Sequence, residues 1–292
     1  MVAQDPKSAE LLVPFLRGEN VKRWRVEPEG LFLINTPKGR VDIDAYPAIR
    51  DWLLPFKPAL EKRATKQEWF ELQQAQLAYQ PSFRTEKIIY GHFAQERIFA
   101  FDREGYFSND KSYFIPNATF DLLSLLNSSV SWFVITGLSP AVRGGFYEMR
   151  VQYIERTPIP ETSLEIRAQL ARLGEACTTA SIGRRDIQAA VCHRILDLAP
   201  PERRKLSQKL EEWWILDFAA FRDEAKRVFR TEIPVKEREE WETYLAEQGE
   251  TVRALTAEIE AAEREIDAIV YRLFDLTPEE ITLLEASIEG QY

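Results

Sequence analysis

The sequence predicts an α+β protein, in which a mixed sheet-and-helix domain over residues 1–160 precedes an all-helical arm over residues 161–292. The first half has short aromatic and β-branched runs between Gly and Pro turns, which is typical of strands. The second half has apolar residues at three- and four-residue steps, which indicates helices. Charge divides at the same place, because residues 1–160 carry 20 Lys and Arg against 19 Asp and Glu, whereas residues 161–292 carry 18 against 28. The N-terminal part, at +1, is therefore a better surface for a polyanion than the arm, at −10.

The strands expected in the first half are residues 31–34, 87–93, 97–101, 106–107 and 112–115, after an apolar run at 12–16. Asp102-Arg-Glu-Gly105 predicts a turn in which Gly105 takes a positive φ. Residues 46–64 begin as a helix that Pro55 and Pro58 interrupt, and residues 119–135 form a second helix. The Pro-Ile-Pro at 158–160 closes the domain.

Helix signals dominate the arm. Thr162-x-x-Glu165 and Thr277-Pro-Glu-Glu280 have capping-box spacing. A heptad pattern favours either packing against another helix of this chain or coiled-coil self-association; its apolar positions are Val252, Leu255, Ile259, Ala262, Ile266, Ile269 and Leu273. A second apolar stripe over residues 206–228, which includes Trp213 and Phe218, predicts the partner helix.

The composition and the N-terminal residues predict the compartment of the cell in which the protein is found. No apolar run reaches the roughly 18 to 20 residues that a membrane span needs, and the N-terminus has no apolar signal region. Cys177 and Cys192 are the only cysteines, which is typical of a reducing cytoplasm. A cytoplasmic protein without membrane partners is expected.

Known catalytic patterns are missing from the sequence. Neither His92 nor His193 has a second ligand at metal-site spacing, so no metal is expected. Phosphate-loop, dinucleotide and nucleophile-elbow glycine motifs are absent. Glu224-Ala-Lys226 matches half of a metal-nuclease pattern, but residues two apart on a helix point to opposite sides. No catalytic residue is therefore expected in this chain.

Five segments, in order, resemble the TaqI-like C-terminal specificity domain. "LVPFLRGENVKRW" at 12–24 resembles the opening of that family, and "EKIIY" at 86–90 resembles one of its strands. "FDREGYFSNDKSYFIP" at 101–116 is similar to its hairpin, and residues 122–133 are similar to one of its helices. "RGGFYEMRVQYIERTPIP" at 143–160 is similar to the C-terminal end of that domain. Segments of the arm at 239–244 and 265–280 resemble the helical end of type IIG restriction–modification chains.

The resemblance implies a target recognition domain for double-stranded DNA in a type II restriction enzyme or adenine-N6 DNA methyltransferase. In such proteins a separate domain binds S-adenosylmethionine and carries an Asn/Asp-Pro-Pro-Tyr/Phe motif, which this sequence lacks. The resemblance therefore implies no cofactor in this chain, and a methyltransferase or nuclease domain or subunit as partner.

Candidate DNA contacts are cationic, polar or glycine residues of the resembling segments: Arg17, Lys22, Arg23, Lys87, Asn109, Lys111, Arg143, Gly144, Gly145, Tyr147 and Arg150. Arg and Lys suit phosphates, and Arg and Asn suit base edges. The two glycines allow close backbone approach to DNA. Two alternatives stay open, since 143–150 also reads as a core loop with buried tyrosines and 108–111 as a plain turn.

A protein-binding scaffold is the competing interpretation. In it, the helical arm docks a methylase or nuclease subunit, and the chain makes little DNA contact of its own.

Overall fold

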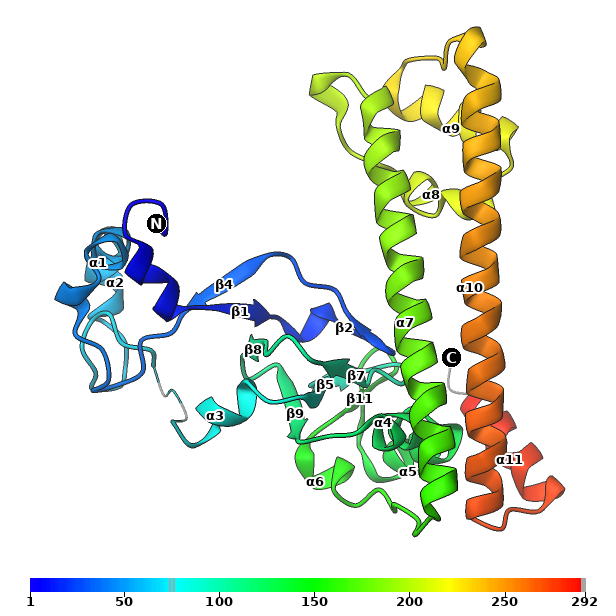
Figure 1. Cartoon of the computed structure of the whole chain (residues 1–292), viewed down its shortest axis with the longest axis horizontal. Helices are drawn as coiled ribbons and strands as arrows, with labels where there is room; N and C mark the ends of the chain where they lie inside the picture. Colours follow the sequence, from blue (N-terminus) through cyan, green and yellow to red (C-terminus); the bar gives the residue numbers. More distant parts are fainter. Residues whose placement is uncertain (74, 76, 290–292) are drawn as a thin grey trace. The chain divides into compact units, whose positions relative to one another are not determined.

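The structure is a computed structural model that describes residues 1–73, 75 and 77–289. Two compact units make up the chain: unit 1 comprises Met1–Glu161 with Leu276–Tyr292, and unit 2 comprises Thr162–Asp275. Strands occur in unit 1 and long helices in unit 2 (Figure 1), so the α+β class is confirmed.

Unit 1 is built from small sheets rather than one large sheet. Their orders are β4-β1-β8, β7-β5-β9, β10-β11-β6 and the hairpin β2-β3. The strand bounds are β1 Leu12–Leu16, β2 Val21–Lys22, β3 Arg25–Val26, β4 Leu31–Ile34, β5 Lys87–Gly91, β6 Phe93–Ala94, β7 Ala100–Asp102, β8 Phe107–Ser108, β9 Ser112–Pro116, β10 Ala141–Val142 and β11 Phe146–Glu148. The expected strands at 31–34, 87–93 and 112–115 are confirmed within a few residues. The turn after Asp102 is also confirmed, with Gly105 at φ +73°.

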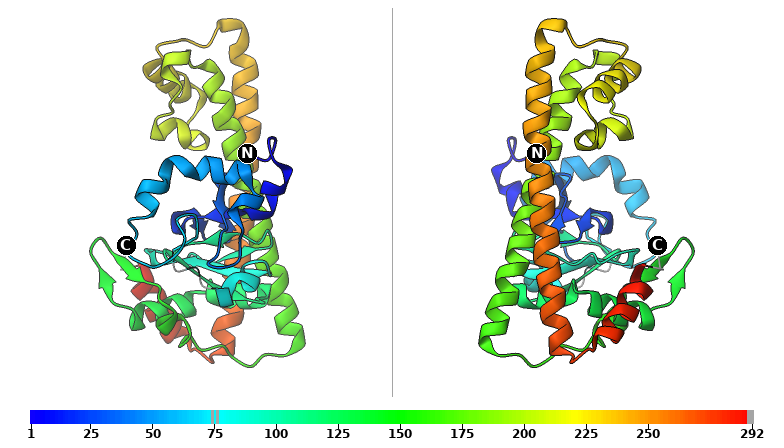
Figure 2. Two further views of the ribbon diagram at one scale, coloured as in Figure 1. Left: turned by 90° about the vertical axis from the view of Figure 1, so that its left-hand side faces the viewer. Right: turned by 90° about the vertical axis from the view of Figure 1, so that its right-hand side faces the viewer.

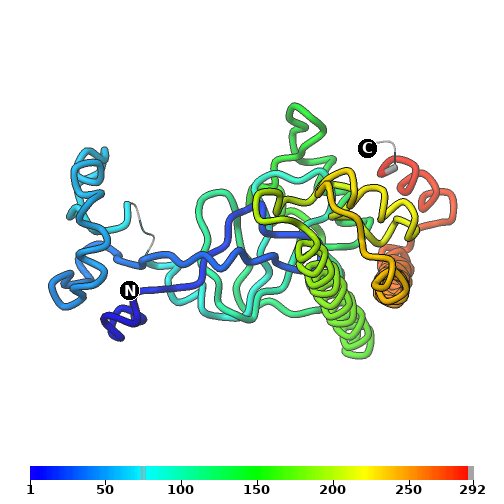
Figure 3. Tube along the Cα trace, turned by 90° about the horizontal axis from the view of Figure 1, so that it is seen from above, coloured from blue at the N-terminus to red at the C-terminus, as the bar shows by residue number. Residues whose placement is uncertain are grey.

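The β1–β4 ribbon separates two apolar clusters within unit 1. One cluster centres on Leu16, Val21, Ile89 and Ala100. The other centres on Leu11, Ile43 and Ile49, near the N-terminus and α1, and Figure 3 shows this blue-to-cyan lobe at the end of the ribbon. Because β1 also pairs with β8 in parallel, the end of the ribbon is fixed to the chain segment that follows β7.

The helices of unit 1 are mostly short: α1 Pro47–Leu53, α2 Lys57–Leu60, α3 Gln80–Phe83, α4 Phe120–Leu126, α5 Ser129–Leu138, α6 Val151–Ile154 and α11 Pro278–Glu289. The chain also forms short 3-10 helices at Pro6–Leu11, Gly18–Asn20, Ile43–Ala45, Leu54–Phe56, Leu77–Tyr79, Leu196–Leu198, Pro201–Arg203, Trp213–Ile215 and Val235–Glu237. The helix expected over 119–135 is split at Asn127 and Ser128, because Ser128 caps α5 by accepting from the Ser131 N–H. Among described residues, no single helix is long and apolar enough for a membrane span, and only α4 with α5, bent by 59°, passes as a pair.

The last helix, α11, corrects the sequence interpretation. Residues 277–289 were expected in the arm, but α11 contacts α5 in unit 1 and buries Leu284 and Ile288. Its N-terminus is as predicted: the Glu280 carboxylate accepts from the Thr277 N–H at 2.8 Å, and the Thr277 hydroxyl accepts from the Glu280 N–H at 3.3 Å.

Unit 2 is an antiparallel pair of long helices, α7 (Leu164–Ile195) and α10 (Arg238–Leu273), with smaller helices beside the end where α7 stops and α10 begins (Figure 1). The direction is clear from cross-contacts, since Gln169 donates to Glu265 at 2.7 Å whereas Arg194 pairs with Glu240 at 2.8 Å. The N-cap of α7 is Ser163, one residue later than expected from the Thr162 pattern.

The partner of the heptad differs from the expected one. The α10 seam packs along α7, and it buries Val252, Ile259, Ile266 and Ile269 within the chain. The stripe at 206–228 is not one helix, because it divides into α8 (Gln208–Glu211), a 3-10 turn and α9 (Phe218–Phe229). Asp217 starts α9 by accepting from the Ala220 N–H at 2.7 Å. These pieces form a cap whose core includes Trp213, Phe221 and Trp241.

Candidate functional site

Three segments of unit 1 that contain or adjoin candidate residues, 17–18, 111 and 148–150, are joined by close main-chain contacts. Parallel pairing of Leu16 with Ser108 places the loop after β1 against the loop before β9. The approach is so close that a Cβ on Gly18 would lie 2.2 Å from the Lys111 carbonyl oxygen. The exposed side chains of Arg17 and Lys111 therefore extend from adjacent segments.

His92 continues these contacts toward the third segment. Its N–H donates to the Lys111 carbonyl at 2.9 Å, and its carbonyl accepts from the Met149 N–H at 2.8 Å. Its ring stacks on Phe93 at 4.3 Å, and Nε2 lies 3.9 Å from the Glu148 carboxylate. The segments at 17–18, 111 and 148–150 are thus joined through the end of β5.

The third segment adjoins a β-hairpin with a glycine turn. Val142 pairs with Phe146, so Arg143, Gly144 and Gly145 form a three-residue loop between β10 and β11. Gly144 and Gly145 have φ of +87° and +76°, a conformation that other residues adopt at a cost. Figure 2 shows the hairpin standing out from the rest of unit 1 as a two-stranded ribbon. Arg143, Gly144 and Gly145, which the sequence predicts to contact DNA, are therefore exposed at the tip of a hairpin.

The two faces of this ribbon differ. Tyr147 is half-buried, with its ring edge-on to Trp132 at 5.8 Å, so it serves mainly to hold the ribbon to α5. Strand alternation puts Val142, Phe146 and Phe93 on the other face, where their exposed fractions are 36%, 37% and 44%. Sequence reasoning missed these last three residues, although the alternation Phe146-Tyr147-Glu148 was a usable signal.

Arg150 lies directly after the ribbon. It is exposed and pairs with Glu148 at 2.8 Å. The Arg150 side chain is 51% exposed and can reach a phosphate, whereas the Glu148 carboxylate that it pairs with is only 15% exposed. Arg17 is similar, since it lies 3.4 Å from Glu19 and 3.6 Å from Glu29 with half of its side chain exposed.

Lys87 must be removed from the candidate surface. Its side chain is fully buried, with Nζ 2.5 Å from Asp102 and 2.6 Å from the Phe83 carbonyl. Burial lowers the pKa of Lys87, and the Asp102 charge opposes that effect. The cation is thus part of the core, and no DNA phosphate can reach it.

The remaining candidates separate by exposure. Lys22 is exposed, whereas Arg23 is half-buried, donates to the Asn127 carbonyl at 3.3 Å and lies over the Trp24 ring at 5.7 Å. Asn109 is exposed, but its Oδ1 accepts from the Lys111 N–H at 3.1 Å and so shapes the turn. The sequence left turn and contact as alternatives here, and the structure shows the turn contact.

The two residues of the nuclease-like pattern, Glu224 and Lys226, lie on α9 of unit 2. Glu224 bonds Arg227 and Ser207, and Lys226 bonds Glu232, so the nuclease-like pair is used for packing α9. No group of side chains suited to a metal occurs among the described residues. Burial raises the pKa of Cys192 to about 11, which makes it a poor nucleophile.

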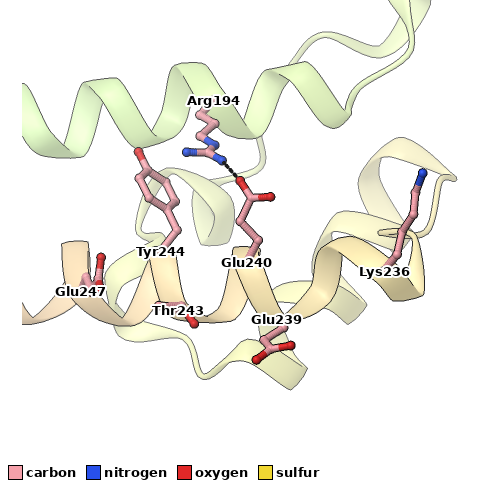
Figure 4. Close-up of a pocket in the computed structure, with 7 residues that line it drawn as sticks. All are labelled: Arg194, Lys236, Glu239, Glu240, Thr243, Tyr244 and Glu247. Atoms are coloured by element: carbon pink, nitrogen blue, oxygen red, sulfur yellow. Dashed lines mark hydrogen bonds and ion pairs between the residues drawn. The ribbon is translucent and has the colours of Figure 1, made fainter.

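A surface hollow of unit 2, about 480 Å³, lies beside the start of α10 (Figure 4). The guanidinium of Arg194, which lines this hollow, already pairs with the Glu240 carboxylate and lies over the Tyr244 ring at 4.2 Å. Three glutamates also line it: Glu239, Glu240 and Glu247. An acidic hollow of this kind does not suit nucleic acid.

Two known families match separate parts of the chain. Residues 163–270 match a domain of unknown function, DUF8810. No curated protein matches the chain. A solved structure described as the Type IIL restriction-modification enzyme MmeI in complex with DNA aligns with 99% of this chain at 12% identity and a TM-score of 0.49. This chain covers 32% of that one, or about a third of its length.

Residues 13–159 match the family described as the TaqI-like C-terminal specificity domain. The matched segment contains both the Arg17 loop and the glycine hairpin. Because the match spans half of the sequence, the chain belongs to the family of TaqI-like C-terminal specificity domains.

Proposed function

We propose that unit 1 is a sequence-specific recognition module for double-stranded DNA, and that it belongs to a restriction–modification adenine-N6 methyltransferase. The observation that carries the proposal is the glycine-turned ribbon with exposed Arg143 and Arg150, joined through His92 to the loops of Arg17 and Lys111. A two-stranded ribbon fits the major groove of B-DNA, where base edges can be distinguished.

The expected division of labour follows from side-chain chemistry. Arg17, Lys22 and Lys111 lie on exposed loops and suit phosphate contacts, which fix register on the duplex. Arg143 and Arg150 are placed on and beside the ribbon, where a guanidinium suits the O6 and N7 atoms of guanine. The exposed Val142, Phe146 and Phe93 side chains suit apolar contact with thymine methyl groups.

Methyl transfer would reside outside this chain. The sequence lacks the Asn/Asp-Pro-Pro-Tyr/Phe motif of adenine-N6 methyltransferases, and the family match is to a specificity domain. We infer that the chain does not bind S-adenosylmethionine and works with a methyltransferase or nuclease domain or subunit. Calorimetry with S-adenosylmethionine is expected to give no heat of binding, and micromolar affinity would contradict this inference.

A second role, as a protein-binding scaffold, remains beside the first. Unit 2 (Thr162–Asp275) carries 18 Lys and Arg against 23 Asp and Glu, a net charge of −5, since Glu161 and the four glutamates of α11 belong to unit 1. If the chain binds a methyltransferase subunit through unit 2 but no duplex, the scaffold interpretation replaces the DNA-binding one.

The test is a binding titration of the whole chain with duplexes selected from a randomised library, at several salt concentrations. Arg150→Ala should cost roughly 1–3 kcal/mol and relax specificity at one base pair if Arg150 meets a guanine. If it meets a phosphate, binding should weaken evenly and the slope of log K against log salt should change by about one.

Arg264→Ala is the matched control, because Arg264 is an exposed arginine on the acidic arm. It should leave affinity and slope unchanged. Unchanged affinity in the folded double variant Arg143→Ala/Arg150→Ala would remove the ribbon from the DNA interface.

A further inference from the structure

We infer that Gln95 is a positioning residue that holds the Arg143–Gly145 turn in its DNA-binding shape. This inference rests on the proposed DNA-binding function. Gln95 follows β6 and is exposed, and its Nε2 donates to the Gly144 carbonyl at 2.7 Å. The bond connects residues 49 positions apart and reaches the tip of the hairpin directly.

The hydrogen bond continues the sheet beyond its last main-chain pair. β6 pairs with β11 through Phe93 with Glu148 and Ala94 with Tyr147. At the next residue along the chain, the donor is a side chain instead of the main chain: the Gln95 amide donates to the carbonyl of Gly144 in the turn. The turn is thereby fixed to β6 and not only to its own two strands.

The turn needs such a restraint. Gly144 and Gly145 follow one another at positive φ, and glycine has the largest backbone freedom of any residue. Gly145 has no other atom within 4 Å of the position that a Cβ would take. The Phe146 ring lies 3.6 Å from the position that a Cβ would take on Gly144. The Gln95 amide and the Phe146 ring therefore limit a turn that its own sequence leaves mobile.

Arg143 is the first residue of this turn, so its direction depends on the turn conformation. A side chain that is pre-organised before binding loses less conformational freedom when DNA binds. Gln95 would thus raise affinity through Arg143, without touching the duplex itself.

The first measurement needs no DNA. Trypsin cleaves after Arg143, and cleavage requires local opening of the turn. Gln95→Met removes the hydrogen-bond donor and keeps the length and charge of the side chain. Loss of one hydrogen bond of ordinary net strength should let trypsin cut the Arg143–Gly144 bond about three- to tenfold faster. The melting temperature should stay unchanged. An unchanged cleavage rate would overturn the positioning role.

The second measurement is a double-mutant cycle on a duplex selected by the unaltered chain from a randomised library. Gln95→Met should weaken binding about three- to tenfold and leave the salt slope unchanged, whereas Arg143→Ala should change that slope by about one. In the Arg143→Ala background, Gln95→Met should have almost no further effect.

Additive losses would show that Gln95 contacts DNA independently and would overturn the inference. Failure of the unaltered chain to bind any duplex would contradict the proposed function, whereas the cleavage result still reports on the Gln95 contact alone.

Discussion

The ammonium group of Lys87 lies 2.5 Å from Oδ2 of Asp102, and both side chains are completely buried. The two residues face each other across the β5–β7 pair. Asp102 also accepts from the N–H groups of Glu104, Gly105 and Tyr106 at 2.8, 3.2 and 2.9 Å. One carboxylate thus connects β5 to the turn that leads into β8, the strand on which the Arg17 loop is held.

Removing the carboxylate should therefore destabilise the domain strongly. Asp102→Ala leaves the Lys87 ammonium buried without its counter-ion, and breaking a buried pair in this way costs about 3–5 kcal/mol. Lys87→Met should cost less, because Asp102 keeps its three N–H donors. Urea unfolding measures both effects. Folded Lys87→Met protein should bind duplex with unchanged affinity, and a changed salt slope would restore Lys87 to the interface.

Gly18 is expected to be intolerant of even the smallest side chain. A Cβ there would meet the Lys111 carbonyl oxygen at 2.2 Å, and that carbonyl is held in place by the His92 N–H, which donates to it at 2.9 Å. Gly18→Ala should cost about 1–3 kcal/mol, as overpacking usually does. Gly137→Ala is the control, because Gly137 lies in α5 with nothing within 4 Å and should be neutral or slightly stabilising. Equal unfolding midpoints for the two variants would contradict the close approach.

Local patterns in the sequence predicted many elements of unit 1. Alternation and β-branched residues marked β4, β5 and β9, and the glycine after Asp102 marked the turn. The same information could not place strands beside one another. The parallel β1–β8 pair joins residues about ninety positions apart, and it is this pair that brings Arg17 near Lys111. Burial of Lys87 was missed for the same reason, since only the pairing of β5 with β7 shows where its charge is satisfied.

The arm shows a different limit. The seam of α10 was evident because large apolar residues form it, but the opposing face of α7 was not. That face buries small or weakly polar residues, among them Gly174, Cys177, Ala180 and Ser181, which carry little periodic signal. The more apolar stripe at 206–228 therefore predicts the wrong partner for this seam. In the structure it forms the cap, broken by the Asp217 N-cap.

Stability of unit 2 should fall at acid pH through Glu224. Hydrogen bonds from Arg227, with smaller contributions from Ser207 and the Arg227 charge, lower the pKa of Glu224 from 4.5 to about 2. A carboxyl whose folded pKa is depressed stabilises the fold above its unfolded value, and this contribution is lost as pH falls from about 4.5 toward 2. Glu224→Gln should be less stable than the unaltered chain at pH 6, and the difference should shrink by pH 2.5. Thermal unfolding of both proteins across this range provides the measurement, and a constant difference would contradict the ion-pair origin.

Lys22 and Arg23 are neighbours in sequence, and the structure predicts opposite consequences for their removal. Lys22 is exposed on the β2–β3 hairpin, so Lys22→Ala should leave the unfolding free energy within about 0.5 kcal/mol. If it meets a phosphate, the slope of log K against log salt should change by about one. Arg23 bonds the Asn127 carbonyl between α4 and α5 and covers the Trp24 ring, so Arg23→Ala should destabilise the fold by about 1–3 kcal/mol. Its folded fraction should bind duplex with an unaltered salt slope. Urea unfolding combined with salt titrations of both variants separates the two roles, and a stable Arg23→Ala protein with a changed slope would return Arg23 to the DNA surface.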